Sequence, residues 1–209
     1  MKFAVSSSEL LKGLLTVSKA IPSKATEAIL EDYLFSLSGD LLEVTASDKE
    51  ITMKTSIAVD NKEGDGRIAV PARQLNDLLR ELPDQPLTIR TISENQFECA
   101  WASGESSLPY FNPDDYPECQ TTGPDAITVE FPAMTLVDGI SRTIYASSDE
   151  DNRPVMNSIF FDINPDSTTL VASDLQKLTC YTADDVKAEN PCSFILNKRH
   201  AAVIKSIIG

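Results

Sequence analysis

The chain has 209 residues, of which 42% are hydrophobic and 24% are charged, and its formal net charge is −14. This composition suits one or two globular domains with an apolar core, and an evenly mixed negative charge would argue against binding nucleic acid. No apolar run approaches the roughly 18 residues that span a membrane, and no secretion signal is visible, so we expect a soluble, cytoplasmic protein without membrane partners.

The N-terminal segment predicts a short strand over 2–6 and then a helix over 7–24. Ser6 and Glu9 have the spacing of a capping box, which marks a helix start. Four apolar residues then recur at helical spacing and form one stripe: Leu10, Leu11, Leu14 and Val17. One face of this helix is therefore expected to pack on a sheet.

The next hundred residues predict strands, one helix and more strands. Ser38-Gly39-Asp40 is a turn between β-type runs at 28–39 and 41–48, and further strands are expected at 50–59 and 67–70. Pro71 opens a helix over 72–82, whose leucines have helical spacing: Leu75, Leu78, Leu79 and Leu82. Two strands at 86–92 and 96–102 and an extended stretch at 106–118 follow.

A tripeptide points to an internal repeat. Ala46-Ser47-Asp48 returns as Ala172-Ser173-Asp174, 126 positions later. The same offset, without gaps, aligns the apolar pattern of 29–40 with that of 155–166 and places Arg73 on Arg199. We therefore expect an α+β fold with tandem copies of one domain, helices packed on antiparallel sheets, at 1–124 and 125–209.

The second copy is expected to be incomplete. Its helices are predicted at 130–148 and 197–209, and Gly209 aligns with Pro83 of the first copy. Residues 84–126 of the first copy have no counterpart. The sequence thus predicts a fragment whose second domain has an open sheet edge.

The charges are not evenly mixed. The four expected helices carry nine Lys or Arg residues and five Asp or Glu residues, whereas the rest of the chain carries nine and 27. This difference has two readings. The helices have ordinary solvated faces, or they form a surface that contacts phosphate without reading base sequence.

The cysteines, the single histidine and the loop acids do not indicate a metal site, a cofactor or a catalytic function. Four cysteines without a CxxC pair and a single histidine, His200, are more typical of free thiols than of zinc ligands. A metal-dependent nuclease could use the loop acids Asp149, Glu150 and Asp151, or Asp114 and Asp115, but consecutive acids usually stay solvated. A protein-interaction scaffold without a nucleic-acid role is the other alternative.

The order and spacing of several motifs carry a family resemblance. They are MKFAVSSSELLKGLLTVSKAI at the N-terminus, IAVPARQLNDLLRELP, DYP at 115–117, MNSIFFDI and VASDLQKLTCYT. On these motifs the chain resembles the bacterial sliding clamp, the beta subunit of DNA polymerase III. The resemblance implies three domains per full-length chain, of which the third is absent here, and a head-to-tail homodimeric ring around double-stranded DNA. It implies a processivity factor, not a catalyst.

The resemblance also implies site residues. Those implied to contact DNA are Lys24, Arg73, Lys12, Arg80, Arg142, Lys198 and Arg199. Those implied for half of a cleft that receives short apolar motifs of the polymerase catalytic subunit, clamp loader and repair polymerases are Arg153, Met156, Ser173, Leu175, Gln176, Lys177 and Leu178. Leu108 is implied at the ring interface.

Some residues depart from the family pattern. Leu175-Gln176 stands where the family usually has Gly-His, and the loop at 147–155 is acidic where the first copy has Lys24. From the residues alone, Ser173-Asp174 reads as an Asx-type turn that ends a strand, and Met156 and Leu178 read as core.

Overall fold

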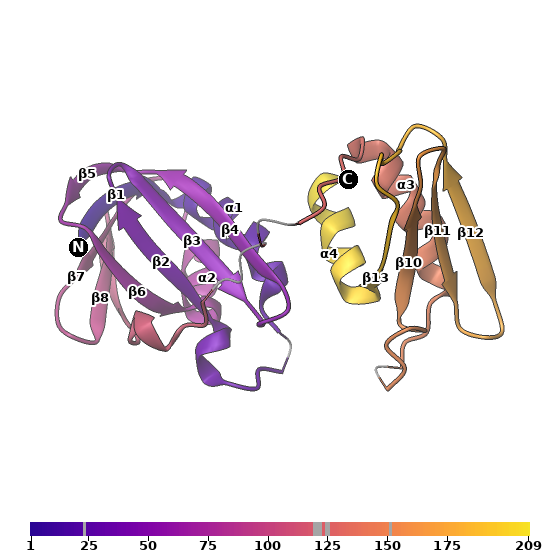
Figure 1. Cartoon of the computed structure of the whole chain (residues 1–209). Helices are drawn as coiled ribbons and strands as arrows, with labels where there is room; N and C mark the ends of the chain where they lie inside the picture. The colour runs from indigo at the N-terminus through magenta and orange to yellow at the C-terminus, as the bar shows by residue number, and fades with distance from the viewer. Residues whose placement is uncertain (23, 119–122, 124–125, 151) are drawn as a thin grey trace. The chain divides into compact units, whose positions relative to one another are not determined.

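The structure, a computed structural model, describes residues 1–22, 24–118, 123, 126–150 and 152–209. The chain divides into two compact units, Met1–Gln120 and Thr121–Gly209 (Figure 1), whereas the repeat places the boundary at 124/125. Within the described ranges, no helix is both long and apolar enough to cross a membrane. Each unit is described by itself below.

Unit 1 contains two antiparallel sheets, with strand orders β5-β1-β7-β8-β9 and β4-β3-β2-β6. The strands of the first are β1 (Lys2–Ser6), β5 (Asp60–Glu63), β7 (Pro86–Thr91), β8 (Gln96–Trp101) and β9 (Gly104–Pro109). The strands of the second are β2 (Asp32–Ser38), β3 (Leu41–Ser47), β4 (Thr52–Ala58) and β6 (Gly66–Pro71). The sequence does not predict the polar strand β5.

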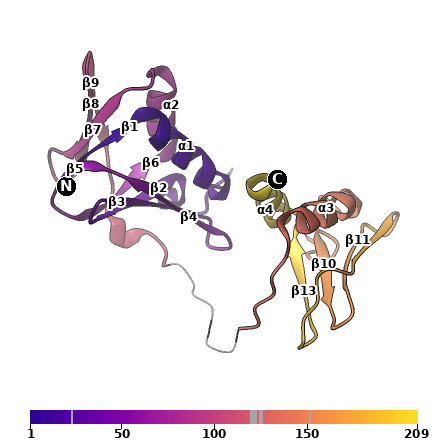
Figure 2. The same ribbon diagram turned by 90° about the horizontal axis from the view of Figure 1, so that it is seen from above.

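Two helices cover the sheets of unit 1. Helices α1 (Ser7–Val17) and α2 (Ala72–Glu81) pack against each other, as Figure 2 shows, and contact strands of the second sheet. Their apolar residues face the core, as the periodicity predicts, and the fully buried ones are Leu10, Leu14, Val17, Leu75 and Leu79. Leu11 and Leu78 are only partly buried against that core.

A buried polar chain joins the two helices of unit 1. The Tyr33 hydroxyl in β2 donates to the Leu14 carbonyl of α1 over 3.2 Å, and it accepts from Asn76 Nδ2 of α2 over 2.8 Å. Asn76 Oδ1 is buried without a hydrogen-bond partner among the described residues. Hydrogen bonds between buried groups fix relative position as well as stabilise, so Tyr33 ties α1 to α2.

In its described residues, unit 2 contains one antiparallel sheet and two α-helices. The sheet has the order β12-β11-β10-β13, with β10 (Ser158–Ile163), β11 (Thr168–Ser173), β12 (Leu178–Ala183) and β13 (Cys192–Asn197). Helices α3 (Ala133–Thr143) and α4 (Lys198–Ile208) pack on each other and on the sheet. The core between them includes Ile140, Ile159, Phe161, Ile163, Leu170 and Ala201.

The structure confirms the repeat in its predicted register. Strand β2 pairs with β6 at Asp32↔Pro71, and β10 pairs with β13 at Ser158↔Asn197, which is the same pair shifted by the offset of the repeat. The two glycines that align also share a role. A Cβ on Gly13 would lie 2.7 Å from Ile57, and one on Gly139 would lie 2.9 Å from Leu170, so both helices approach their sheets at a glycine.

Both long helices of the prediction are shorter in the structure. Helix α1 ends at Val17 and a 3₁₀ turn follows over Ser18–Ala20, because Pro22 favours an extended conformation at Ile21. Lys24 therefore lies in a loop and not on the predicted helix over 7–24. The predicted helix over 130–148 begins only at Ala133, after a proline that an α-helix interior would exclude, and ends in the 3₁₀ turn Ile144–Ala146.

Two strand predictions also need correction. The run at 28–39 begins with a 3₁₀ turn over Ala28–Glu31, and β2 starts at Asp32, opposite the last residue of β6. The repeat maps β1 onto residues 128–132 and so predicts a strand before α3, but these residues form none. In unit 1 the matching strand, β1, pairs along its whole length with β7, and the counterpart of β7 falls beyond residue 209.

Candidate functional site

The second Ser-Asp pair closes a tight turn between β11 and β12. Asp174 Oδ1 accepts hydrogen bonds from the backbone N–H groups of Gln176 at 2.9 Å and Lys177 at 2.7 Å. Ser173 Oγ accepts from the Leu175 N–H and donates to the Lys177 carbonyl. The Lys177 N–H, then the Lys177 side chain, lower the pKa of Asp174 to about 2, so this carboxylate stays charged and holds the turn.

Leu175 is strained in this turn. Its φ is +74°, in the left-handed region that glycine adopts freely and that costs other residues about 1–2 kcal/mol. Its side chain is also 68% exposed. The left-handed conformation follows from the turn, because Lys49 has a φ of +78° at the equivalent position of unit 1, but packing does not explain an exposed leucine there.

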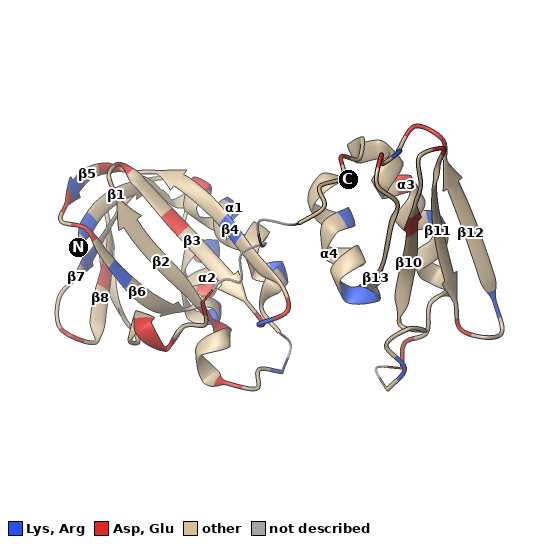
Figure 3. Ribbon diagram, in the orientation of Figure 1, with Lys and Arg blue, Asp and Glu red and all other residues tan. Residues whose placement is uncertain are grey.

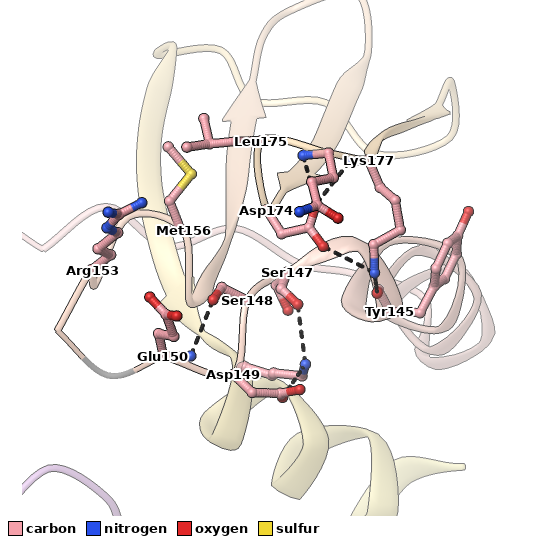
Figure 4. A pocket seen from close by; sticks show the side chains of 12 residues that line it. Tyr145, Ser147, Ser148, Asp149, Glu150, Arg153, Met156, Asp174, Leu175 and Lys177 are labelled. Carbon is pink, nitrogen blue, oxygen red and sulfur yellow. Dashed lines mark hydrogen bonds and ion pairs between the residues drawn. The ribbon is translucent and has the colours of Figure 1, made fainter.

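A pocket of about 500 Å³ opens beside the turn (Figure 4). Its lining comes from the 3₁₀ turn after α3, the loop that follows, the Ser-Asp turn and the start of α4: Tyr145, Ser147, Ser148, Asp149, Glu150, Arg153, Met156, Asp174, Leu175, Gln176, Lys177 and Lys198. Met156 and Leu175 supply its apolar part. The pocket therefore combines a small apolar patch with a charged rim.

The structure brings five of the seven cleft residues implied by the resemblance to this pocket: Arg153, Met156, Leu175, Gln176 and Lys177. The other two do not line it. Ser173 uses its hydroxyl inside the turn, and Leu178 begins β12 with 72% of its surface exposed, which also excludes the core interpretation of that residue. Met156 is only partly buried.

The opposite wall of the pocket was missed. Tyr145, the segment 147–150 and Lys198 come from elements that the Ser-Asp motif does not mark. Lys177 Nζ links the two walls, because it donates to the Tyr145 carbonyl at 3.2 Å and lies 3.0 Å from Asp174 Oδ2. The acidic sequence of the loop at 147–155 was the one available signal for this wall, because Asp149 and Glu150 both line the pocket.

Six of the seven cations implied to contact DNA lie on α-helices, and Lys24 lies in the loop after α1. Figure 3 shows Lys and Arg in blue on these helices, with others on the strands and loops. In unit 1, Lys12 and Lys24 are exposed, and the Arg73 side chain is 95% exposed. Arg73 and Arg80 lie on either side of Asp77, at 3.9 and 3.5 Å, contacts that exposed side chains readily give up.

The cations of unit 2 are less uniform. Arg142 is exposed, lies 3.9 Å from Asp138 and stands over the Tyr181 ring at 5.8 Å. Arg199 is exposed in the first turn of α4. Lys198, in contrast, is turned toward the pocket: its Nζ bonds Asp149 Oδ1 at 2.6 Å and the Ser147 carbonyl at 3.2 Å.

The acids considered for a nuclease do not gather. In the part of the chain that the structure describes, no three His, Cys, Asp or Glu side chains form a group that could hold a metal ion. Asp149 pairs with Lys198, and Asp114 lies 3.9 Å from Arg67. Asp151 lies outside the described residues.

The cysteines have separate environments. Cys99 is buried, which raises the pKa of its thiol to about 12, whereas Cys180 is exposed and Cys192 is partly buried. These three are free thiols. Cys119 lies outside the described residues.

Solved structures share this fold. A putative DNA polymerase III beta subunit from Eubacterium rectale matches with a TM-score of 0.91 and 26% identity, over 100% of this chain and 56% of that one. A sliding clamp from Pseudomonas aeruginosa bound to griselimycin matches with a TM-score of 0.90 at 22% identity, over the same shares of the two chains.

Sequence relatives agree with the structural ones. The beta sliding clamp of Synechococcus elongatus is 24% identical over 93% of this chain and 52% of its own length, and that of Halalkalibacterium halodurans is 28% identical over 85% and 48%. The chain thus spans about half the length of the curated relatives it matches. The family described as DNA polymerase III beta subunit, N-terminal domain, matches residues 1–120. Because that match covers more than half of the chain, the chain belongs to the DNA polymerase III beta subunit family.

Proposed function

We propose that this chain is part of a ring-shaped sliding clamp, a processivity factor that encircles duplex DNA in the cytoplasm and tethers the replicative polymerase. The observation that carries the proposal is a tandem domain repeat in a chain of the DNA polymerase III beta subunit family. Rings are built from repeated surfaces, and a ring around DNA acts by topology without catalysis. No cofactor is needed for this function.

The helices supply the proposed DNA contacts. Lys12, Lys24, Arg73 and Arg80 in unit 1 and Arg142 and Arg199 in unit 2 are exposed cations on helices or beside them. Scattered Lys and Arg contacts to phosphate hold DNA without reading its sequence and weaken as salt rises. This is the weak, uniform binding that sliding requires.

The pocket of unit 2 is the proposed partner site. Met156 and Leu175 offer an apolar patch to a short motif of the polymerase catalytic subunit, clamp loader or a repair polymerase, and Arg153 stands on the rim. The exposed leucine supports this role, because 68% of Leu175 is open to solvent and no packing explains an apolar side chain there.

Strand β9 supplies the proposed ring contact of a homodimer. It is the edge strand of its sheet, and it carries Leu108, which packs partly on the unit 1 core. An edge strand presents unpaired backbone groups to another subunit. We therefore propose that Leu108 lies at the ring interface.

The test is retention on circular DNA compared with the same DNA linearised, for a polypeptide in which this chain is extended to complete the second unit and to add a third. We expect retention on the circle and rapid loss from linear ends. Lys24→Ala with Arg73→Ala should weaken association about equally for all DNA sequences. Equal loss from both DNA forms would favour the scaffold alternative, and a sequence-confined effect would contradict non-specific contact.

A further inference from the structure

Lys198 is held differently from Arg142 and Arg199, the other unit 2 cations that the resemblance implies at the DNA surface. It is the first residue of α4, and its side chain is only 26% exposed. Its Nζ contacts Asp149 Oδ1 at 2.6 Å and the Ser147 carbonyl at 3.2 Å, and these residues lie on the pocket wall. The ammonium group is thus committed to the pocket.

The position of Lys198 on its helix favours an acidic partner. The N-terminus of a helix carries a partial positive charge, so a cation there is unfavourable unless an anion compensates. The Asn197 side chain caps the helix by accepting from the Arg199 N–H and supplies no charge. Asp149 supplies it, and Lys198, followed by Lys177, lowers the pKa of the Asp149 carboxyl.

The backbone of Lys198 holds the other end of the same loop. The Lys198 N–H donates to the Asn157 carbonyl at 3.0 Å. Within the loop, the Ser148 N–H donates to the Met156 carbonyl at 2.8 Å, and the Met156 N–H donates to the Arg153 carbonyl at 2.9 Å. One residue therefore binds the segment 147–149 with its side chain and Asn157 with its backbone.

In unit 1 the equivalent position carries no ammonium group. The counterpart of Lys198 in the repeat is Ala72, which is buried at the start of α2. The next residue, Arg73, is the exposed cation there, and it aligns with Arg199. The repeat thus assigns phosphate contact to the second helical residue and leaves the first to a separate role in unit 2.

We propose that Lys198 is a positioning residue of the partner pocket, which sets the loop carrying Arg153 and Met156, and not a DNA contact. This inference rests on the proposed partner site. The Lys198–Asp149 pair holds the loop in one conformation. An apolar motif then binds without having to order the loop first.

The experiment uses the 209-residue chain and four variants. Lys198→Met and Asp149→Asn each break the ion pair, and Lys198→Asp with Asp149→Lys restores it with the charges exchanged. Lys205→Met removes one positive charge from the same helix outside the pocket and is the matched control. Three quantities are measured: amide hydrogen exchange at Ser148 and Met156, affinity for a fluorescein-labelled peptide ending in Leu-Phe, and affinity for a short duplex DNA.

We expect each single change at the pair to raise amide exchange and to weaken peptide binding by about 1.5-fold to fivefold, the range of exposed ion pairs, because the Asp149 side chain is 91% exposed. The variant with exchanged charges should recover the low amide exchange and the peptide affinity. If the single changes acted by disturbing packing and not by breaking the ion pair, the exchanged variant would recover neither. Duplex affinity of Lys198→Met should equal that of Lys205→Met, since each loses one charge.

Two results would overturn the inference: unchanged exchange at Ser148 and Met156 in Lys198→Met, or a larger loss of duplex affinity in Lys198→Met than in Lys205→Met. If the unaltered chain binds no apolar peptide, the proposed partner site fails. Amide exchange then still decides whether Lys198 fixes the loop.

Discussion

The turn after β3 in unit 1 and the turn after β11 in unit 2 share a backbone and differ in their side chains. Asp48 accepts from the N–H groups of Glu50 and Ile51, as Asp174 does from those of Gln176 and Lys177. Lys49 and Leu175 occupy the same left-handed position, with φ of 78° and 74°. The duplication has therefore preserved the turn to the level of single dihedral angles.

The residues at that left-handed position separate the two units. In unit 1, Lys49 forms an ion pair with Glu27. Their counterparts in unit 2 are Leu175 and Arg153, which line the pocket and cannot form such a pair. The fold therefore supplies the turn, and side-chain replacement on it creates the candidate binding site.

The largest difference between the units should appear in their cores. Phe35 and Phe161 are counterparts and both are buried, but Phe161 stacks at 4.8 Å on Phe194, which is 45% exposed. Phe35→Ala should cost about 3–5 kcal/mol of unfolding free energy, and Phe161→Ala less, because its surroundings can collapse or hydrate. Trp101 is the only tryptophan of the sequence and packs on the unit 1 core, so its fluorescence during urea unfolding reports the stability of unit 1 and the effect of Phe35→Ala.

Circular dichroism over the same titrations reports both units. Phe161→Ala should leave the Trp101 transition in place while lowering the stability of the remaining signal. An equal shift of the Trp101 transition by both changes would mean that the two units unfold together and would contradict their separate cores.

The buried polar chain in unit 1 is the next difference. Tyr33 and Asn76 have the apolar counterparts Ile159 and Ala202 in unit 2. Tyr33→Phe strands Asn76 Nδ2 and should cost about 1–3 kcal/mol of unfolding free energy. Adding Asn76→Ala removes the stranded group and should recover part of the loss in thermal or urea unfolding. A double variant less stable than either single one would contradict this account.

The strained turn of unit 2 predicts a trade between stability and binding. Leu175→Gly should relieve the left-handed strain and raise stability by up to about 1 kcal/mol. It should also weaken binding of the apolar peptide, because half of the apolar patch is lost. In unit 1, Lys49→Gly should gain less stability, since it also removes the ion pair with Glu27. Tighter peptide binding by Leu175→Gly would exclude Leu175 from the site.

The smallest expected effects are two pH dependences of opposite sign. Burial, with a contribution from Glu31, raises the pKa of Asp32 to about 6, so folding is penalised as pH rises from about 4 to about 6. Asp32→Ser, the unit 2 residue at that place, should stabilise unit 1 above pH 6 and not below pH 4.

Asp174 behaves in the opposite way. Its lowered pKa, about 2, contributes stability above pH 4 that is lost as pH falls toward 2. Asp174→Asn should therefore reduce stability at pH 7 and leave it nearly unchanged near pH 2. Unfolding titrations at pH 2, 4 and 7 check both signs, and equal effects of either variant at all three values would contradict the assigned groups.

Much of the fold is predictable from sequence because its signals are local. The leucines of α1 and α2 repeat at helical spacing, and the repeated Ala-Ser-Asp gives the register of unit 2. Strand β5 is polar and lies at a sheet edge, so it carries no apolar alternation to detect. The missing strand before α3 depends on a pairing partner, which no local pattern reports.

Only the wall of the candidate site that lies next to the repeated motif is predictable from sequence, again because local signals are needed. Leu175, Gln176 and Lys177 lie next to the repeated motif, so the register finds them. Asp149 and Lys198 are 49 positions apart and meet only when α4 packs beside the end of α3. Contacts that depend on tertiary packing produce no characteristic residue spacing, so the sequence alone does not reveal them.

The difference between the two turns is tested most directly by titrating the apolar peptide into the isotope-labelled 209-residue chain. We predict one peptide per chain, with amide shifts at Met156, Leu175 and Lys177 and none at Lys49 and Ile51. Two peptides per chain, or shifts at both turns, would contradict the claim that only unit 2 carries the binding site.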